Sequence, residues 1–534
     1  MRVDRPARPE PARAVVFGLD RVELAALAAL AALSMAVLAA LLTKGRPITG
    51  ADGLLASDQL QYFTWIRESS EHVLIGNRYD FQPDHRVFLH PGFLLSGLLH
   101  RATGISIPLS YLLWKPAAVV LAFAAARAYV GRLVEGRGAR HAALLLILFG
   151  VMPASALVAW TGWGGKPRQY TFDFISGEMW TGQYLWGYLM TAIAVFLIPV
   201  ALLAVERWRR TRRLRPLVVA CLAALFCSWL QPWQGTTLVL VVLGAEAIAW
   251  WRSRERPAPA FLAVPAAAVL PLAYYFVLSS SDPSWKLASQ TNQAGSHLLW
   301  TWPWWAIVLT LAPLAVPAAL AYRRPARDWQ EVALRLWPLA ALAVYVQPAG
   351  TFPFHSFQGL AIPLSVLAVQ GVTSVWPRPR AALVVALLTL MSIPGWVHKA
   401  EVAANSVHRA GDPYFVFPDE QHAIAALAHD PRAGGVLAPA YDGHMLPYQT
   451  GREVWVGALS WTPDWDARVR ATRALFETGM APGRARAYVR QTGARFIFVD
   501  CRPRQRDLAP TLQPLLAEVH RFGCATLYVL RSPQ

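Results

Sequence analysis

A short segment near the start of the chain carries the residues best suited to chemistry. Residues 52–68 read DGLLASDQLQYFTWIRE. If a helix begins at Ser57, then Asp58, Tyr62 and Trp65 lie on one face of it, because side chains three and four positions apart are neighbours. A carboxylate there can take a proton from a hydroxyl group, and aromatic faces can hold a sugar ring. Alternatively, Asp58 only stabilises the start of the helix, because an acidic side chain interacts favourably with the dipole at a helix N-terminus. The spacing alone favours this structural role.

Two further polar groups interrupt apolar sequence. His90 precedes Pro91 at the start of the short piece HPGFLLSGLLH, where its side chain either points into a cavity or caps a helix. Residues 231–234 (QPWQ) end an apolar block, and polar groups at membrane depth usually face the interior of a helix bundle or a cavity. They either contact a bound sugar or only stabilise a kink.

Membrane-spanning helices must position these residues, because apolar sequence dominates the chain. Of 534 residues, 55% are hydrophobic and 15% are charged, whereas soluble domains contain about 25% charged residues. The apolar residues form blocks of about twenty, the length that crosses about 30 Å of hydrocarbon. We therefore expect a polytopic α-helical membrane protein with about eleven transmembrane helices. The expected spans are residues 22–43, 108–130, 140–160, 183–205, 216–232, 236–251, 260–279, 298–321, 331–347, 359–375 and 380–397.

The net charge of +18 raises the question of nucleic acid. We reject that partner because the arginines do not gather on one soluble face but fill alternate gaps between the apolar blocks. This distribution follows the positive-inside rule and predicts a cytoplasmic N-terminus and, with an odd number of spans, an extracytoplasmic C-terminus. The arginine-rich gaps are residues 2–21, 127–140, 207–215, 252–256, 323–327 and 378–380.

Two long loops are expected on the outer side of residues 1–397, at 44–108 and 160–182. The first contains the piece HPGFLLSGLLH (90–100), which is too short to span and reads as a helix along the membrane interface. The second is rich in aromatic residues, which suggests that it folds over the membrane surface.

Residues 398–534 lack apolar blocks and predict a separate soluble extracytoplasmic α/β domain. We expect strands at 434–440, 453–459, 494–500 and 525–531, and helices at 418–429, 464–478 and 508–523. Cys501 and Cys524 form a disulfide or remain two free thiols. Asp442, His444, Trp461 and Asp464 fall in loops, where they bind an acceptor or serve as turn residues. We prefer the turn interpretation, since Asp-Gly and Pro-Asp are turn patterns.

The arrangement resembles the GT-C glycosyltransferases, polytopic enzymes that include protein O-mannosyltransferases and the lipid A aminoarabinose transferase. The resemblance is carried by ASDQLQYFTWIRE and HPGFLLSG after a first span, and by FPFHSFQGLAIPLSVLAVQG before a late span. The resemblance extends to two segments of the tail, LAPAYDGHMLPYQTGREVWVGALSWTPDWDAR and YVRQTGARFIFVD. It implies a donor sugar linked to a polyprenyl phosphate.

The resemblance also implies roles for residues. An acidic residue of the first outer loop serves there as catalytic base or metal ligand, which points to Asp58 first and Asp52 second. The family often shows a tighter acidic pair, whereas these two are six residues apart. A divalent metal ion is implied as a possible cofactor, with Asp58, Asp173 and Glu178 as candidate ligands. Such carboxylates are more often simply solvated.

A lipid phosphate leaving group would need cationic or metal stabilisation. The candidates on the expected outer side are Lys166 and Arg168 in the second loop, Arg67 and Arg86 in the first, and His355 before a late span. For each of them an interfacial anchor or a contact to lipid headgroups is the favoured interpretation.

These features favour a transferase of the bacterial-type inner membrane that moves a sugar onto a hydroxyl of an extracytoplasmic glycan, lipid or protein. Two alternatives stay open: a secondary transporter or flippase, and a non-catalytic envelope protein. Few charges lie inside the expected spans, which favours surface chemistry over a transmembrane path. No P-loop, Rossmann, HExxH or GxSxG motif is convincing, so ATP-driven transporters and hydrolases have no support.

Overall fold

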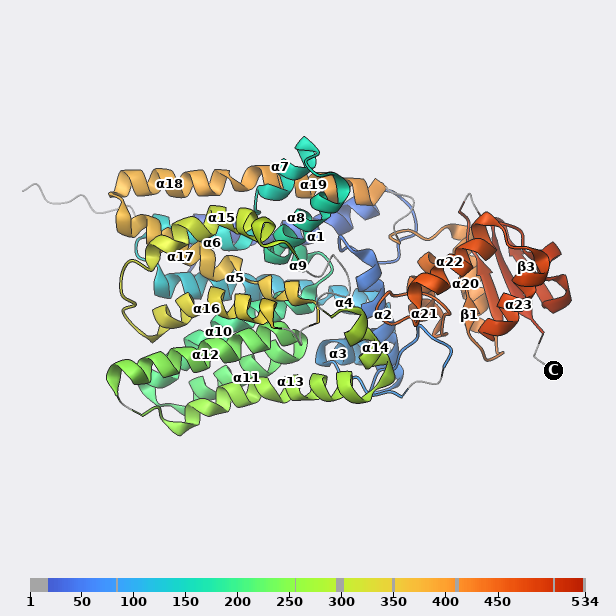
Figure 1. Cartoon of the computed structure of the whole chain (residues 1–534), viewed down its shortest axis with the longest axis horizontal. Coiled ribbons are helices and arrows are strands. Elements are labelled where there is room, and N and C mark those ends of the chain that lie inside the picture. The colour runs from blue at the N-terminus through green and yellow to red at the C-terminus, as the bar shows by residue number, and fades with distance from the viewer. Residues whose placement is uncertain are drawn as a thin grey trace, which may run out of the picture.

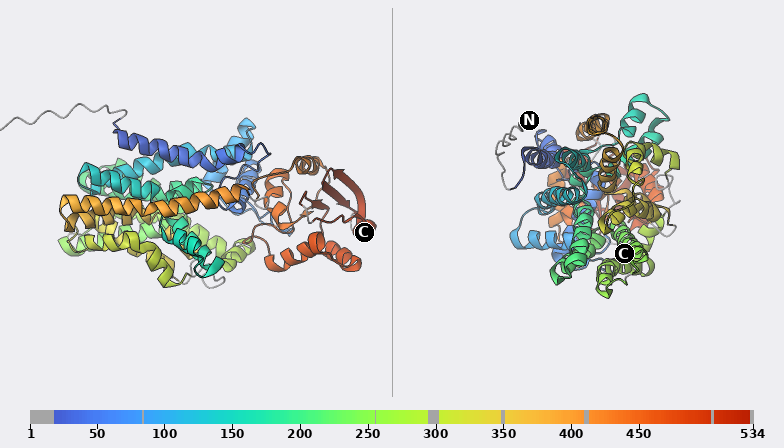
Figure 2. Two further views of the ribbon diagram at one scale, coloured as in Figure 1. Left: turned by 90° about the horizontal axis from the view of Figure 1, so that it is seen from above. Right: turned by 90° about the vertical axis from the view of Figure 1, so that its left-hand side faces the viewer.

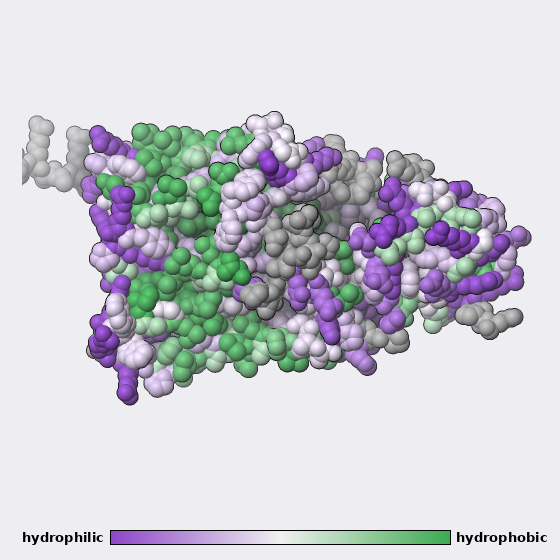
Figure 3. Space-filling view, viewed as in Figure 1, coloured by the Kyte–Doolittle hydropathy of each residue, from purple (hydrophilic) through white to green (hydrophobic). Residues whose placement is uncertain are grey.

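The computed structural model describes residues 18–82, 85–254, 256–293, 302–347, 351–408, 413–502 and 505–531. A long helical bundle occupies one part of the molecule, and a smaller α/β domain lies at one end of it (Figure 1). The bundle helices are seen end-on in the right view of Figure 2, so they run along the long axis. On the face shown in Figure 3, hydrophobic side chains cover the bundle, with hydrophilic ones at its far end and over the α/β domain.

Seven helical segments are long and apolar enough to cross a membrane, and a bent pair makes an eighth. Each predicted span overlaps one of these or a shorter bundle helix, and residues 298–301 of the eighth predicted span lie outside the described residues. The polytopic α-helical fold class is confirmed. The long segments are α1 (Arg21–Leu42), α4 and α5 (Ile107–Leu112, Trp114–Leu133), α10 (Leu189–Thr211), α12 (Pro232–Ser253), η1 and α13 (Pro259–Leu262, Ala263–Ser281), α15 (Trp304–Ala321), and α18 and α19 (Arg378–Leu390, Ser392–His408). The bent pair is α6 (Arg137–Phe149) with α7 (Ala154–Thr161), and the shorter bundle helices are α11 (Leu214–Leu230), α16 (Trp329–Val346) and α17 (Ala361–Val375).

Short helices close the end of the bundle that faces the α/β domain. They are α2 (Ala56–Glu71), α3 (Pro91–Thr103), α8 (Gly165–Met179), α9 (Thr181–Leu185), α14 (Pro283–Thr291) and η2 (Pro353–Phe357). Helices α2 and α3 pack closely because Gly97 has no side chain. A Cβ at Gly97 would lie 2.6 Å from backbone atoms of Ser69 and Ser70. The predicted helix at 90–100 is therefore present as α3, held against α2.

The tail forms a four-stranded sheet in the order β1-β2-β4-β3. Its strands are β1 (Val436–Leu437), β2 (Phe496–Val499), β3 (Leu516–Phe522) and β4 (Ala525–Leu530), with β1 parallel to β2 and the other pairs antiparallel. The helices are α20 (Pro418–His429), α21 (Ala440–Thr450), α22 (Trp465–Arg473) with the π-helical turn η3 (Ala474–Thr478), α23 (Pro482–Thr492), α24 (Ala509–Leu512) and the 3-10 turn η4 (Gln513–Leu515). A disulfide joins Cys501 to Cys524, so the free-thiol alternative is wrong.

Two tail predictions are wrong. The expected strand at 453–459 provides only a single bridge, between Val454 and Val436. The expected helix at 508–523 ends at Leu512, and β3 follows after a short turn. Strand β3 is mostly exposed and pairs along β4 through a tight turn at Gly523. Cross-strand pairing has overridden the helical spacing of this segment. The boundary drawn after residue 397 falls inside α19.

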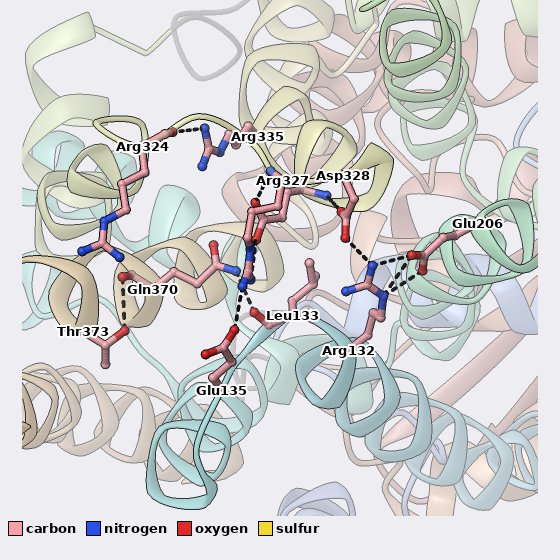
Figure 4. Close-up of polar contacts among 11 residues, drawn as sticks. Arg132, Leu133, Glu135, Glu206, Arg324, Arg327, Asp328, Arg335, Gln370 and Thr373 are labelled. Atoms are coloured by element: carbon pink, nitrogen blue, oxygen red, sulfur yellow. Dashed lines mark hydrogen bonds and ion pairs between the residues drawn. The ribbon is translucent and has the colours of Figure 1, made fainter. Parts of the chain in front are cut away.

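An ion-pair network ties helices together at the bundle end away from the tail (Figure 4). Arg132 of α5 contacts Glu206 of α10 and Asp328, the residue that caps α16. In the same network Arg327 donates at 2.6 Å to Glu135 and at 2.6 Å to Glu331. These contacts fix the loop between α15 and α16 against α5 and α10.

Arg132→Met should lower the free energy of unfolding by about 3 kcal/mol, because Glu206 would lose its main partner while buried. Arg210→Met is the matched control: Arg210 also approaches Glu206, at 3.7 Å, but its side chain is 65% exposed. We expect the control to cost less than about 1 kcal/mol. Thermal unfolding in detergent measures both. Equal losses in the two variants would contradict the role of Arg132.

Candidate functional site

A cavity of about 690 Å³ lies where the bundle meets the α/β domain. Its walls come from α2, α3, α14, the adjoining ends of α10, α12, α13 and α16, and the tail segment 458–461. Elements far apart in the sequence therefore share one chamber. Its polar lining residues include Ser57, Asp58, Gln61, His90, Glu178, Gln183, Tyr188, Gln231, His355, Gln358, His444 and Ser460.

Asp58 is the carboxylate that α2 presents to this cavity. Its Oδ2 accepts a hydrogen bond of 2.8 Å from the hydroxyl of Tyr188, which directly precedes α10. Burial raises the pKa of Asp58, because loss of water disfavours the charged form, while the Tyr188 hydrogen bond acts in the opposite direction. A carboxylate with a raised pKa holds a proton more tightly and is a stronger general base.

Tyr188→Phe should shift the acid side of the pH–activity profile to higher pH. The hydrogen bond stabilises the charged carboxylate, so its loss raises the pKa of Asp58 further and leaves less of the deprotonated form at a given pH. Rates measured across an acid-to-neutral pH series test this. A rate lowered equally at every pH would instead show that Tyr188 only supports the fold.

Aromatic side chains form much of the remaining wall. Tyr62 and Trp65 lie on the same face of α2 as Asp58, and all three line the cavity. The Tyr62 ring stacks on Phe93 with 5.3 Å between centroids, and Trp65 stands edge-on to Trp461 of the tail at 5.5 Å. Trp461 also meets Trp285 of α14 at 5.1 Å. These flat apolar surfaces beside a carboxylate suit a sugar ring.

His355 and Glu178 form a second polar group in the cavity. The Nδ1 of His355 lies 3.0 Å from Glu178 and 2.9 Å from the amide of Gln358. The ring also packs edge-on against Trp233 at 4.7 Å. Among the described residues, Nε2 of His355 has no hydrogen-bond partner, and it remains available to a ligand. Glu178 and Gln358 both contact Nδ1, so they hold the ring in place beside the cavity.

His90 has both of the roles considered from the sequence, a helix cap and a side chain in the cavity wall. Its Nδ1 accepts the backbone N–H of Phe93 at 3.3 Å and caps α3, while the ring lines the cavity. Burial lowers the pKa of His90 to about 3, so the ring is neutral at physiological pH. His90 therefore does not supply a positive charge to this site.

No protein-family model matches the chain, and no curated protein matches it in sequence. The apo oligosaccharyltransferase of Archaeoglobus fulgidus, a solved structure, is similar with a TM-score of 0.54 and 14% identity, over 90% of this chain and 69% of that chain. The chain has the GT-C fold. This confirms the fold expected from the resemblance in sequence.

Two further solved structures are similar to this chain with lower TM-scores. ArnT from Cupriavidus metallidurans in the apo state has 12% identity and a TM-score of 0.48, over 96% of this chain and 98% of that chain. ArnT bound to undecaprenyl phosphate has 12% identity and a TM-score of 0.47, over 96% and 99%. The assignment of the GT-C fold rests on the oligosaccharyltransferase, and at such identities the likeness is one of fold alone.

Within the GT-C fold of this chain, Asp52 lies outside the cavity. It forms an ion pair of 2.7 Å with Lys115 and accepts a hydrogen bond of 3.0 Å from Gln59, with the Asp52 side chain 0% exposed. The backbone N–H groups of Asp52 and Gly53 donate to the same Gln59 side chain. Asp52 therefore fixes the start of the first outer loop and the position of α2.

The remaining candidate cations also lie outside the lining. Lys166 is exposed, and Arg168 stacks on Trp163 and Trp305 with its guanidinium carbon 4.2 Å and 5.2 Å from the ring centroids. Arg67 donates to carbonyl groups of the tail, and Arg86 pairs with Glu68 at 3.2 Å. No lysine or arginine is among the described residues that line the cavity. His355 is the candidate that reaches it.

The metal site expected from Asp58, Asp173 and Glu178 is not assembled. Glu178 and Phe174 are one helical turn apart on α8 and line the cavity, whereas Asp173 binds His398 of α19 at 2.7 Å. Around Asp58, no group of three His, Cys, Asp or Glu side chains in the described ranges brings its ligand atoms within 4.8 Å of one another. The residues present therefore do not fit a preformed cation site.

Sequence reasoning did not identify Tyr188, because it lies 130 residues from Asp58 and no local pattern connects them. It did single out Trp461 and His444 but preferred a turn role for both. The structure places them in the cavity wall. The backbone of Trp461 accepts a hydrogen bond of 2.9 Å from Asn77, and Ser460 accepts one of 2.9 Å from Asn292. The tail is thus fastened beside the cavity to the segment between α2 and α3 and to the end of α14.

Proposed function

We propose that the protein is a membrane glycosyltransferase that moves a sugar from a polyprenyl phosphate to a hydroxyl acceptor. One observation carries this proposal: a single cavity is lined both by a lipid-facing span and by the α/β domain. Phe276 of α13 lines it and is 73% exposed on the bundle surface, whereas Ser460 and Trp461 line it from the tail. A donor held in the bilayer and an acceptor from water can therefore meet beside Asp58.

The reaction proposed is a direct displacement. The Asp58 carboxylate takes the proton of the acceptor hydroxyl while the oxygen of that hydroxyl attacks the anomeric carbon of the donor sugar. The bond from that carbon to the phosphate oxygen breaks as the new glycosidic bond forms, and the lipid phosphate leaves with the electron pair. His355, with its Nδ1 held by Glu178, stabilises the charge on the phosphate. Tyr62, Trp65 and Trp461 hold the sugar.

The orientation follows from charge. The described arginine-rich loops, among them residues 207–215, 252–254 and 323–327, lie at the end of the bundle away from the α/β domain (Figure 1). The positive-inside rule places that end in the cytoplasm. The cavity and the tail then face the outside of a bacterial-type inner membrane, where lipid-linked sugars are the available donors. The arginines at positions 2, 5, 8 and 13, which belong to the predicted cytoplasmic N-terminus, lie outside the described residues.

Proteoliposomes containing the full chain and a panel of radiolabelled polyprenyl phosphate sugars test the proposal. With an envelope extract as the source of acceptors, we expect label to move from lipid to a covalent product. A transporter or flippase would move the labelled lipid across the bilayer without forming a product. That outcome, with donors shown to bind, would reject the transferase.

A further inference from the structure

A small pocket lies at the opposite end of the bundle from the cavity, where α10 and α12 end and the chain turns into η1. Its volume is about 50 Å³, enough for a group of a few heavy atoms. Two arginines, Arg212 and Arg256, and two tryptophans, Trp208 and Trp250, are among its lining residues. The proposed reaction uses none of them.

The electrostatics of this arginine pocket favour an anion. Its one described carboxylate, Glu246, is buried and already paired with Arg209. Among the described residues, Arg212 and Arg256 have no ion-pair partner, so two further guanidinium groups of the lining are not paired with a described carboxylate. The planar fork of a guanidinium matches the oxygens of a phosphate group. A choline or ethanolamine headgroup would bring a positive charge against these arginines.

The backbone at the pocket is unusual. Arg212 ends α10 with φ of 54°, in the left-handed region that residues with side chains rarely adopt. Its guanidinium carbon lies 5.0 Å from the centroid of the Trp208 ring. The arginine is thus held beside the pocket by the helix end and by an aromatic contact.

Aromatic and apolar side chains are exposed at and beside the lining. Trp250 lines the pocket and is 51% exposed, and its neighbour Trp251 and Leu262, which follows the lining residue Phe261, are 66% and 51% exposed. Tryptophan concentrates where hydrocarbon meets headgroups. An anion that reaches this pocket most readily is therefore attached to a lipid.

We infer that the arginine pocket binds the phosphate group of an anionic phospholipid, in the leaflet on the arginine-rich side. The site is separate from the cavity and does not depend on the proposed transferase activity. Arg212 and Arg256 bind the phosphate oxygens, and the two indoles lie at the level of the glycerol backbone.

The test compares two double variants with the same change of charge. Arg212→Gln with Arg256→Gln removes the lining arginines. Arg213→Gln with Arg254→Gln removes exposed neighbours that do not line the pocket, and Arg254 shares the left-handed conformation of Arg212, with φ of 60°. Full-length protein is placed in nanodiscs of phosphatidylcholine, with and without phosphatidylglycerol, and thermal unfolding is followed.

Phosphatidylglycerol should raise the melting temperature of the wild type and of the neighbour variant, but not of the lining variant. Native mass spectrometry should show at least about tenfold weaker retention of phosphatidylglycerol by the lining variant. If both double variants lost phosphatidylglycerol binding equally, the lipid would be held by diffuse electrostatic attraction and not by a defined site, and the inference would be overturned. A further sample contains inorganic phosphate in phosphatidylcholine nanodiscs. If phosphate raised the melting temperature as much as phosphatidylglycerol does, the claim that the bound phosphate belongs to a lipid would be rejected.

Discussion

Asp58→Asn should lower the rate of sugar transfer by about 10²–10⁴-fold, the range of a general base. Asparagine keeps the size of the side chain and can still accept the hydrogen bond from Tyr188, so the cavity wall should persist. The variant loses the negative charge that receives the acceptor proton. Initial rates with a saturating lipid-linked donor measure the effect.

Glu71→Gln is the matched control for Asp58→Asn. Glu71 ends the same helix α2, but its side chain is 49% exposed, and its one ion pair within the described residues is with Arg67, at 3.4 Å. We expect transfer by this variant to stay within about twofold of the wild type, because exposed pairs contribute little. Binding of the donor should be unchanged in both variants. Near-normal transfer by Asp58→Asn would remove Asp58 from the mechanism.

His355→Ala should lower kcat/KM for the donor by about 10²-fold, because a charge-stabilising group at the leaving phosphate is lost. Glu178→Gln should have a smaller effect of the same kind. Glutamine can still accept a hydrogen bond from Nδ1 of His355 but lacks the negative charge of Glu178 beside the ring. Steady-state kinetics against donor concentration, with melting temperatures as a check on folding, test both variants.

His422→Ala provides the control for His355→Ala, since His422 is exposed on α20 of the tail and does not line the cavity. Its kinetics should match the wild type. If His355→Ala left kcat/KM intact, the phosphate would have to be stabilised by another group. No described lysine or arginine of the lining could replace it.

Local spacing was sufficient to predict which side chains share the face of α2 that lines the cavity. Asp58, Tyr62 and Trp65 share one helix face, and a helix of known pitch leaves little freedom in where they point. The spans were equally predictable, because a bilayer demands long apolar segments. The mixed pattern at 516–522 was not, since pairing with β4 depends on a strand that follows it in the chain.

Long-range contacts explain the other departures. Asp52 and Asp58 look alike in sequence, but Lys115 from α5 pairs with Asp52 and leaves only Asp58 in the cavity. The partner of Asp58, Tyr188, comes from the start of a distant span. Asp173 precedes Phe174 on α8 and so faces His398 instead of the cavity. None of these choices is encoded within a few residues of the carboxylate concerned.

The anomeric configuration of the product tests the central claim most directly, namely that Asp58 acts as a base for direct displacement in this cavity. The sugar is transferred from a polyprenyl phosphate of known configuration, and the anomeric coupling constant of the product is measured by NMR. A single displacement predicts inverted configuration. Retained configuration would mean that a covalent glycosyl intermediate forms on the enzyme, and it would contradict the role given to Asp58.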